Sequence, residues 1–169
     1  VGSDFVVGCR ISADEHVDGG LTLDEVIKMI PLVEQGLDYI HVSSGTAESY
    51  NWCIPEETDK ILPEAIKVKE AASIPVLCPN IHTPEHAESA IKNGKIDMVA
   101  LGRPLLADPE WPKKVINGEV SKIKKCLRDN NCLRRVFTAM KIKCIVNPEV
   151  GHERFNPEYY PPARIVKYW

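Results

Sequence analysis

Three cysteines near the C-terminal end of the chain have the spacing of a soft metal-ligand set. Five residues separate Cys126 from Cys132, and eleven separate Cys132 from Cys144. Thiolates in such a set bind iron–sulfur clusters or zinc. A familiar four-ligand set would also contain a Cys-x-x-Cys pair, but Asp129 stands three residues after Cys126. Aspartate is a harder donor than thiolate, so a four-iron cluster, a three-iron cluster, zinc or no metal at all remain open.

A second candidate is the Gly102-Arg103 pair, which follows an apolar run. A glycine lets the backbone approach a phosphate closely, and an arginine grips the phosphate with two donors. The alternative is an ordinary glycine turn followed by a surface arginine.

Arg10 lies at the end of another apolar run, where a buried guanidinium needs an anion or another acceptor. It would either stabilise negative charge on an electron-rich cofactor ring or form a salt bridge with Asp14 or Glu15. We expect His41, inside an apolar strand, to be a satisfied core residue. His82, at a strand end, is the better site candidate.

The remaining polar residues are weaker candidates for a functional site. His16 has no evident partner in the sequence. The aromatic residues of the polar loop that carries Trp52 and Cys53 could cover a substrate, but we expect a packed loop. No Ser-His-Asp or paired-carboxylate arrangement has persuasive spacing, so no catalytic residue is assigned.

The elements that must position these residues alternate between strand and helix. Strand-like apolar runs cover residues 5–12, 37–45, 74–78 and 98–103, and helical patterns cover residues 23–36, 62–72 and 83–94. This alternation predicts an α/β fold with a parallel sheet. Such a sheet is either half of a (β/α)8 barrel or a small open sheet, and both folds place their chemistry at the C-terminal ends of the strands. A lysine-studded helical stretch follows between residues 113 and 125.

Bulk properties narrow the class of protein. The 169 residues are 44% hydrophobic and 27% charged with a net charge of −3, which argues against a nucleic-acid-coating protein. No apolar run approaches the roughly 18–20 residues of a membrane span. Six cysteines without any secretion signal favour a reducing, cytoplasmic location. The absence of an initiator methionine suggests a processed or partial chain.

Four segments together resemble the iron–sulfur flavoenzymes related to old yellow enzyme. That family includes 2,4-dienoyl-CoA reductase, 2-enoate reductase, the bile-acid-inducible NADH:flavin oxidoreductases and trimethylamine dehydrogenase. The segments are residues 7–15, 38–45, 97–109 and 144–149, and the resemblance covers nearly the whole chain.

The resemblance implies a domain plan. The family has an FMN-binding (β/α)8 TIM barrel, then a 4Fe–4S cluster segment, then a domain for FAD and NAD(P)H. On that plan residues 1–118 are the C-terminal half of the barrel (strands 5–8), residues 119–155 the cluster segment, and residues 156–169 a linker toward an absent nucleotide-binding domain. FMN and a 4Fe–4S cluster with Asp129 at one ligand position are the cofactors implied for this chain, and FAD and NAD(P)H enter only through absent domains.

The resemblance also implies roles for individual residues. Arg10 would lie against the flavin pyrimidine edge, and Asn131 near the route between cluster and flavin. The FMN phosphate would be served by Asn80, Gly102 and Arg103, and the cluster would be held by Cys126, Cys132 and Cys144.

Three departures from the family matter. Asp129 replaces a cysteine, with a spacing to Cys132 like that of trimethylamine dehydrogenase. Pro79-Asn80 replaces a glycine-containing turn at the phosphate. The first four strands, which carry the proton donor and most flavin contacts in the family, are not in this sequence.

The resemblance implies an NAD(P)H-dependent reduction of an activated C=C bond in a small-molecule substrate such as an enoate, enone or dienoyl thioester. We expect the isolated chain to be inactive, since half of the barrel is missing. One alternative is a subunit of a split flavoenzyme, in which a partner chain or a second copy covers the open half barrel. Another is a non-catalytic assembly module that has lost the cluster.

Overall fold

A computed structural model of the chain describes residue 2 and residues 4–153. The chain divides into two compact units, Val1–Gly102 and Arg103–Trp169. The linker expected at residues 156–169 lies outside the described residues. The expected division at residue 118 concerns function rather than compactness and stays a prediction.

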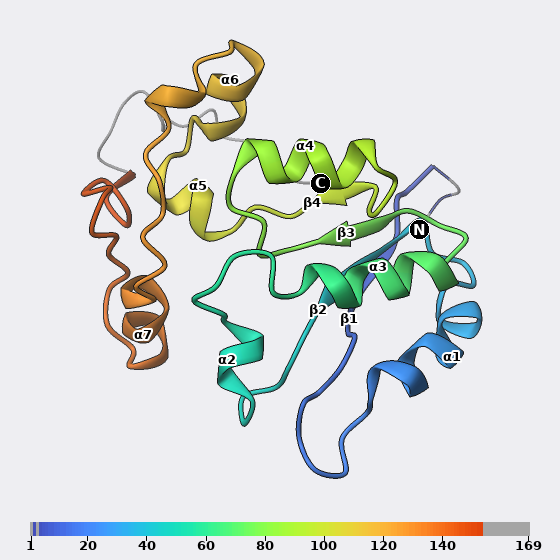
Figure 1. Ribbon diagram of the computed structural model, residues 1–169. Coiled ribbons are helices and arrows are strands. Elements are labelled where there is room, and N and C mark those ends of the chain that lie inside the picture. Colours follow the sequence, from blue (N-terminus) through green and yellow to red (C-terminus); the bar gives the residue numbers. More distant parts are fainter. Residues whose placement is uncertain (1, 3, 154–169) are drawn as a thin grey trace. The chain divides into compact units, whose positions relative to one another are not determined.

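The first unit contains a four-stranded parallel sheet in the order β1-β2-β3-β4 (Figure 1). Its strands are β1 (Gly8–Ser12), β2 (Tyr39–Ser43), β3 (Val76–Cys78) and β4 (Met98–Val99). A doubly wound open sheet reverses its strand order at a switch point, whereas a barrel keeps the order of the sequence. The sequential order therefore selects the half barrel over the open sheet.

Three helices pack against one face of this sheet. They are α1 (Leu23–Val33), α3 (Leu62–Ala71) and α4 (Pro84–Lys92). A single buried apolar cluster joins them to the strands, and it includes Val26, Ile30, Ile40, Val42, Ala65, Val68, Val76, Cys78, Ala87 and Ala90. Helices on one face leave the other face to line a barrel interior, as the family fold requires.

The helix starts follow from local sequence. The Glu25 carboxylate accepts hydrogen bonds from the Thr22 backbone N–H and hydroxyl at 2.9 and 2.7 Å, which caps α1 and lowers the pKa of Glu25. At α4, the Thr83 hydroxyl accepts from the His86 N–H at 3.4 Å, and Pro84 takes the first helical position. Both starts were predicted from the cap residues and are confirmed.

The largest differences from the predicted elements fall after β4. The strand ends at Val99, and Arg103 begins a short helix, α5 (Arg103–Ala107). The lysine-rich stretch is two elements, α6 (Trp111–Ile116) and η1 (Val120–Lys122), because Gly118 breaks it with φ +71°. The last described helix is α7 (Asn131–Phe137).

The loop after β2 also contains a four-residue helix, α2 (Tyr50–Cys53), where a packed polar loop was predicted. One helical turn is too short to produce a hydrophobic period in the sequence.

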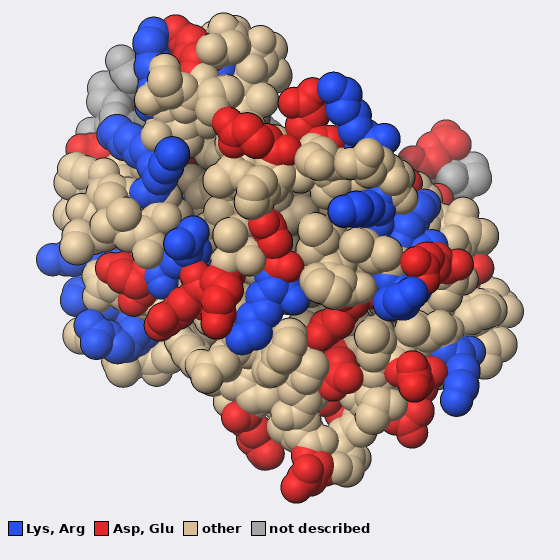
Figure 2. All heavy atoms as spheres, in the orientation of Figure 1, with Lys and Arg blue, Asp and Glu red and all other residues tan. Residues whose placement is uncertain are grey.

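The surface gives two further observations. Acidic and basic side chains are interspersed on the face shown in Figure 2. Among the described residues, none of the helices combines the length and the apolar character that a membrane crossing would require.

Candidate functional site

The open face of the half barrel carries a row of side chains, one from each strand. The strand register pairs Arg10 with His41, His41 with Leu77, and Leu77 with Met98. These positions alternate with Ile40, Val42, Val76 and Cys78, which face the helices. The row therefore lies on the face that would line the barrel interior.

Arg10 is exposed on this face, so the expectation of a buried guanidinium is wrong. In the described part of the chain, Arg10 forms no ion pair with Asp14 or Glu15. Their carboxylates instead accept from the backbone N–H groups of Leu23 and Leu21, at 3.1 and 2.8 Å. The side chain of Arg10 thus remains available to a ligand on the open face.

His41, beside Arg10, is not the satisfied core histidine that was expected. Its Nε2 is buried and has no hydrogen-bond partner among the described residues. Burial lowers the pKa of His41, and the neighbouring Arg10 charge lowers it further. A neutral imidazole with an orphaned ring nitrogen therefore stands next to a guanidinium, which suits a polar ligand inside the barrel.

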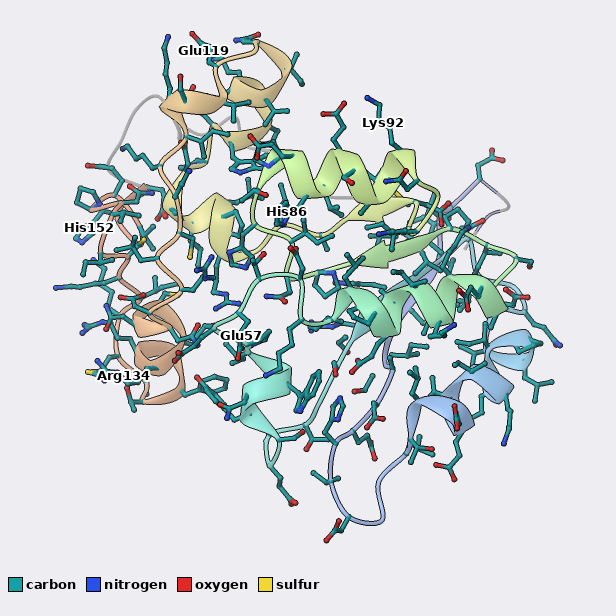
Figure 3. All side chains as sticks on the ribbon, in the orientation of Figure 1. Glu57, His86, Lys92, Glu119, Arg134 and His152 are labelled. Carbon is teal, nitrogen blue, oxygen red and sulfur yellow. The ribbon has the colours of Figure 1, made fainter. Side chains whose placement is uncertain are left out.

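Asn80, expected at a phosphate, uses its side chain inside the protein. Its Oδ1 accepts from the Lys60 N–H at 2.8 Å, and its Nδ2 donates to the Glu57 carbonyl at 2.9 Å. Glu57, labelled in Figure 3, belongs to the segment between α2 and α3. Asn80 is buried and has φ +65°, a left-handed conformation that suits the glycine of the usual turn. These bonds make Asn80 an anchor for the 57–60 loop. His82, two residues later, is half-buried.

Gly102 leaves room where a phosphate was expected. A Cβ added there would meet no heavy atom within 4 Å, and its φ is not in the left-handed region. The backbone conformation therefore does not require a glycine there, and the space beside it is open.

Arg103 contacts the segment that carries the cysteines. Its Nη1 donates to the Asn130 Oδ1 at 2.5 Å. Asn130 is 7% exposed and has φ +55°, a conformation that asparagine tolerates better than most residues. The arginine that was expected at a phosphate thus binds the loop that carries the cysteines.

The three cysteines lie in the second unit as free thiols, with Cys132 buried and Cys126 and Cys144 half-buried. The Arg128 N–H donates to the Cys126 Sγ at 3.4 Å. Arg128 and Asn130 both have positive φ, at +58° and +55°. Such alternating backbone conformations direct N–H groups into a concave surface that is common at iron–sulfur sites.

The other two cysteines affect the pKa of the Cys132 thiol. Burial raises the pKa of Cys132, nearby Cys126 and Cys144 raise it further, and the Arg103 charge opposes this rise. Across residues 2 and 4–153, however, no group of three or more His, Cys, Asp and Glu side chains is arranged to hold a metal ion. The chemistry of the thiols fits a cluster, but the sulfurs would have to draw together to bind one.

Asp129 is the predicted ligand with the poorest fit. It is exposed, and its Oδ1 accepts from the backbone N–H of Asn131 at 3.3 Å. Asn131 is half-buried at the first position of α7, and its Oδ1 accepts from Arg134, which Figure 3 labels on that helix, at 3.5 Å.

A polar network that was not predicted lies at the strand ends of the first unit. His16 Nε2 lies 3.1 Å from the Ser44 hydroxyl and 2.8 Å from Glu64 Oε1. Its ring stacks on Trp52 with centroids 3.7 Å apart, and the Lys60 ammonium lies 4.6 Å from the Trp52 ring centroid. His16 therefore has partners, contrary to the expectation. They are 28 and 48 residues away in sequence, too far for any local pattern to reveal.

The fold and this site define a half barrel of the flavoenzyme type with an attached cysteine-bearing segment. Residues 1–121 match the family described as NADH:flavin oxidoreductase / NADH oxidase. The chain belongs to this family, which confirms the resemblance drawn from the sequence.

Relatives agree with that assignment. The chain is 40% identical over 160 residues to an NADH oxidase of Thermoanaerobacter brockii, covering 90% of this chain and 25% of the relative. It is 32% identical over 173 residues to a cinnamate reductase of Clostridium sporogenes, covering 90% and 26%. The chain thus spans about a quarter of the length of the curated relatives it matches.

Solved structures support the fold. A 2-naphthoyl-CoA reductase complex superposes with TM-score 0.80 at 30% identity, over 90% of this chain and 23% of that one. Histamine dehydrogenase from Rhizobium sp. 4-9 superposes with TM-score 0.77 over 88% and 22%, and at 24% identity it supports the fold alone.

Proposed function

We propose that this chain is the C-terminal half of an FMN-binding barrel together with an iron–sulfur segment, from an enzyme that reduces activated C=C bonds with NAD(P)H. In this proposal residues 1–118 belong to the barrel and residues 119–155 to the cluster segment. FMN supplies hydride transfer when bound. FAD and NAD(P)H would bind to other domains, and the remaining strands would come from elsewhere in a longer protein or from a partner chain.

The Arg10–His41 pair carries the proposal. Closing the barrel would bury Arg10, and a buried guanidinium needs an anionic or electron-rich partner. The reduced flavin ring is such a partner, and the orphaned His41 Nε2 offers it a second polar contact. We assign Arg10 to the flavin ring and the Gly102 backbone and Arg103 to the phosphate. The bonds of Asn80 give it a supporting role through the 57–60 loop.

The substrate class is inferred from the names of relatives. These include a cinnamate reductase and an NADH:acrylate oxidoreductase, both named for unsaturated acids. Another relative is named N,N-dimethylglycine/sarcosine dehydrogenase, for saturated amines. We favour the unsaturated acids, and the amine is a suitable counter-substrate in a test.

A chimera tests the proposal. The segment of the T. brockii NADH oxidase that aligns with this chain over 160 residues would be replaced by this chain. We expect the chimera to bind FMN and to oxidise NADH with cinnamate as the electron acceptor. With dimethylglycine as the electron donor, it should not reduce an artificial electron acceptor. Arg10→Ala should reduce FMN-dependent turnover, whereas Lys95→Ala, at an exposed position, should not. A folded chimera that takes up no FMN would refute the proposal. The isolated chain should show no turnover with added FMN.

A second candidate is a non-catalytic assembly module, and one observation favours it. Asp129 stands at an expected ligand position, as a decaying ligand set would leave it. Under this alternative the chain would take up no iron and sulfide under anaerobic conditions. The absorbance of thiolate-to-iron charge transfer would then be absent.

A further inference from the structure

The α2 loop, residues 45–53, follows β2 at the carboxyl ends of the strands and is held there without a buried apolar anchor (Figure 1). All four residues of α2 are half-buried or exposed. The buried apolar cluster of the described residues contains none of them. Segments with few buried apolar contacts open at a low cost in free energy. The position of the α2 loop therefore depends on a small number of polar and ring contacts.

His16, in the loop after β1, contacts α2 and α3 at the same time. Its ring stacks on the Trp52 ring, with centroids 3.7 Å apart and an interplanar angle of 9°. Its Nε2 lies 2.8 Å from Glu64 Oε1, and its Nδ1 lies 3.5 Å from Asp14 Oδ1. Both ring nitrogens thus face carboxylate oxygens, and both can donate only when the imidazole is protonated.

The burial of Glu64 favours a positive charge on His16. Glu64 is 7% exposed, and its Oε2 is buried with no hydrogen-bond partner among the described residues. A buried carboxylate without a compensating charge is costly. In the described part of the chain, the one ion pair of Glu64 is with His16. A neutral imidazole would therefore leave the Glu64 charge buried and uncompensated.

The other polar groups around this contact do not supply that charge. The Ser44 hydroxyl, which lies 3.1 Å from the imidazole Nε2, is neutral. The Lys60 ammonium lies 4.6 Å from the Trp52 ring centroid and pairs with Glu57 at 3.4 Å. The carboxylate of Glu15 accepts from a backbone N–H of its own loop. The proton on the imidazole is thus the charge that holds the two loops and α3 together.

We propose that His16 is a pH-dependent latch that holds the α2 loop closed at the strand ends. The protonated imidazole bridges two carboxylates and presents a cationic ring to Trp52, which strengthens the stacking. Loss of one proton to solvent removes a donor from a carboxylate and removes this cation–π attraction. The α2 loop then depends on weaker contacts, such as the bond from the Ser49 hydroxyl to the Glu15 carbonyl at 2.6 Å. The loop therefore opens as the pH rises through about 5–8, where histidines change charge.

The latch would control access to the strand ends. Ligands of (β/α)8 barrels bind at the carboxyl ends of the strands, and loops there open and close over them. The α2 loop occupies that end of the sheet, so its opening would expose the surface beside β2. The latch uses residues of the first unit alone and depends on no cofactor. It goes beyond the proposed function and can be tested on this chain.

The test uses fluorine NMR of the full chain of 169 residues with its three tryptophans replaced by fluorotryptophan. Trp52→Phe identifies the Trp52 resonance, whose chemical shift is followed between about pH 5 and pH 8. The wild type is compared with His16→Asn, because asparagine tolerates the φ of +51° at this position. Glu64→Gln keeps an acceptor but removes the charge. The matched control is His86→Gln, at an exposed histidine on α4 (Figure 3).

We expect the Trp52 resonance of the wild type to move with rising pH toward its value in the urea-unfolded chain, while the other two resonances stay in place. His16→Asn should show the open value throughout, and Glu64→Gln should move the midpoint to lower pH. His86→Gln should behave like the wild type. Far-ultraviolet circular dichroism checks that each chain is folded at each pH.

Three results would overturn the latch. The first is a Trp52 resonance that does not move in the folded wild type. The second is a transition that persists unchanged in His16→Asn, and the third is a transition that disappears in His86→Gln. If His16→Asn does not fold, Glu64→Gln decides the question, and an unchanged midpoint in that variant also overturns the inference.

Discussion

The bond between Arg103 and Asn130 should make a measurable contribution to the stability of the second unit. The Nη1–Oδ1 distance is 2.5 Å, and Asn130 is 7% exposed. A hydrogen bond to a charged group contributes about 1.5–3 kcal/mol. Arg103 is only half-buried, so we expect Asn130→Gly to lower the free energy of unfolding by about 1.5 kcal/mol, the lower end of that range.

Two further variants separate the bond from the backbone. Asn130 has φ +55°, where an alanine costs about 1 kcal/mol and glycine costs nothing sterically. Asn130→Ala should therefore lose about 1 kcal/mol more than Asn130→Gly. The matched control is Asn117→Gly, at an exposed position after α6, where we expect a loss of about 0.5–1 kcal/mol.

Urea unfolding followed by tryptophan fluorescence measures these differences. Replacing Trp52 and Trp169 by phenylalanine leaves Trp111, which is 6% exposed in the second unit, as the reporter. If Asn130→Gly costs no more than Asn117→Gly, the bond does not stabilise the unit. If Asn130→Ala and Asn130→Gly are equal, the argument from backbone conformation is wrong.

Three other predictions concern the ion pair of Asp108 and the cysteines. Asp108 is 2% exposed and accepts from the Lys114 ammonium and the Lys124 N–H at 2.7 and 2.8 Å, so Asp108→Asn should cost about 3–5 kcal/mol in urea unfolding. Burial alone would raise the pKa of Asp108, but the Lys114 and Lys124 hydrogen bonds hold it below its ordinary value. The stabilisation of the folded state by Asp108 is therefore complete above about pH 3.9 and is lost as the pH falls further. If acid unfolding is equally steep in Asp108→Asn and in the wild type, this reasoning is wrong. Burial raises the pKa of Cys78 to about 12, so its thiol should react slowly. After treatment with iodoacetamide, mass spectrometry should find the exposed Cys53 alkylated and Cys78 unmodified. Rapid labelling of Cys78 in the folded chain would refute its burial.

Features encoded by neighbouring residues were predictable from the sequence. Thr22 with Glu25, and Thr83 with Pro84, set the starts of α1 and α4, because a cap involves residues only a few positions apart. The parallel sheet was predictable because the alternation of strands and helices is also a pattern of residues that are close in sequence. The end of β4 was less predictable, because the apolar run continues past Val99 although the pairing with β3 stops there.

The site was harder to predict because its geometry depends on distant partners. The apolar run around Arg10 suggested burial, but strand alternation places Arg10 on the face without helices. His16 joins Ser44 and Glu64 only after two strands and a helix have come together. Asp129 matched a ligand position by spacing, whereas its exposed carboxylate accepts a hydrogen bond from the Asn131 N–H.

The sequential strand order also bears on how this chain behaves in concentrated solution. In a sheet of the order β1-β2-β3-β4, the edge strands are β1 and β4, and their backbone groups can pair with a further strand. The edge strand β4 is only two residues long and is a poor template for pairing with another chain. The edge strand β1 is five residues long and is a better one. We therefore expect aggregation of the chain at high concentration to proceed through β1. A strand that pairs with Gly8–Ser12 would also prevent this aggregation.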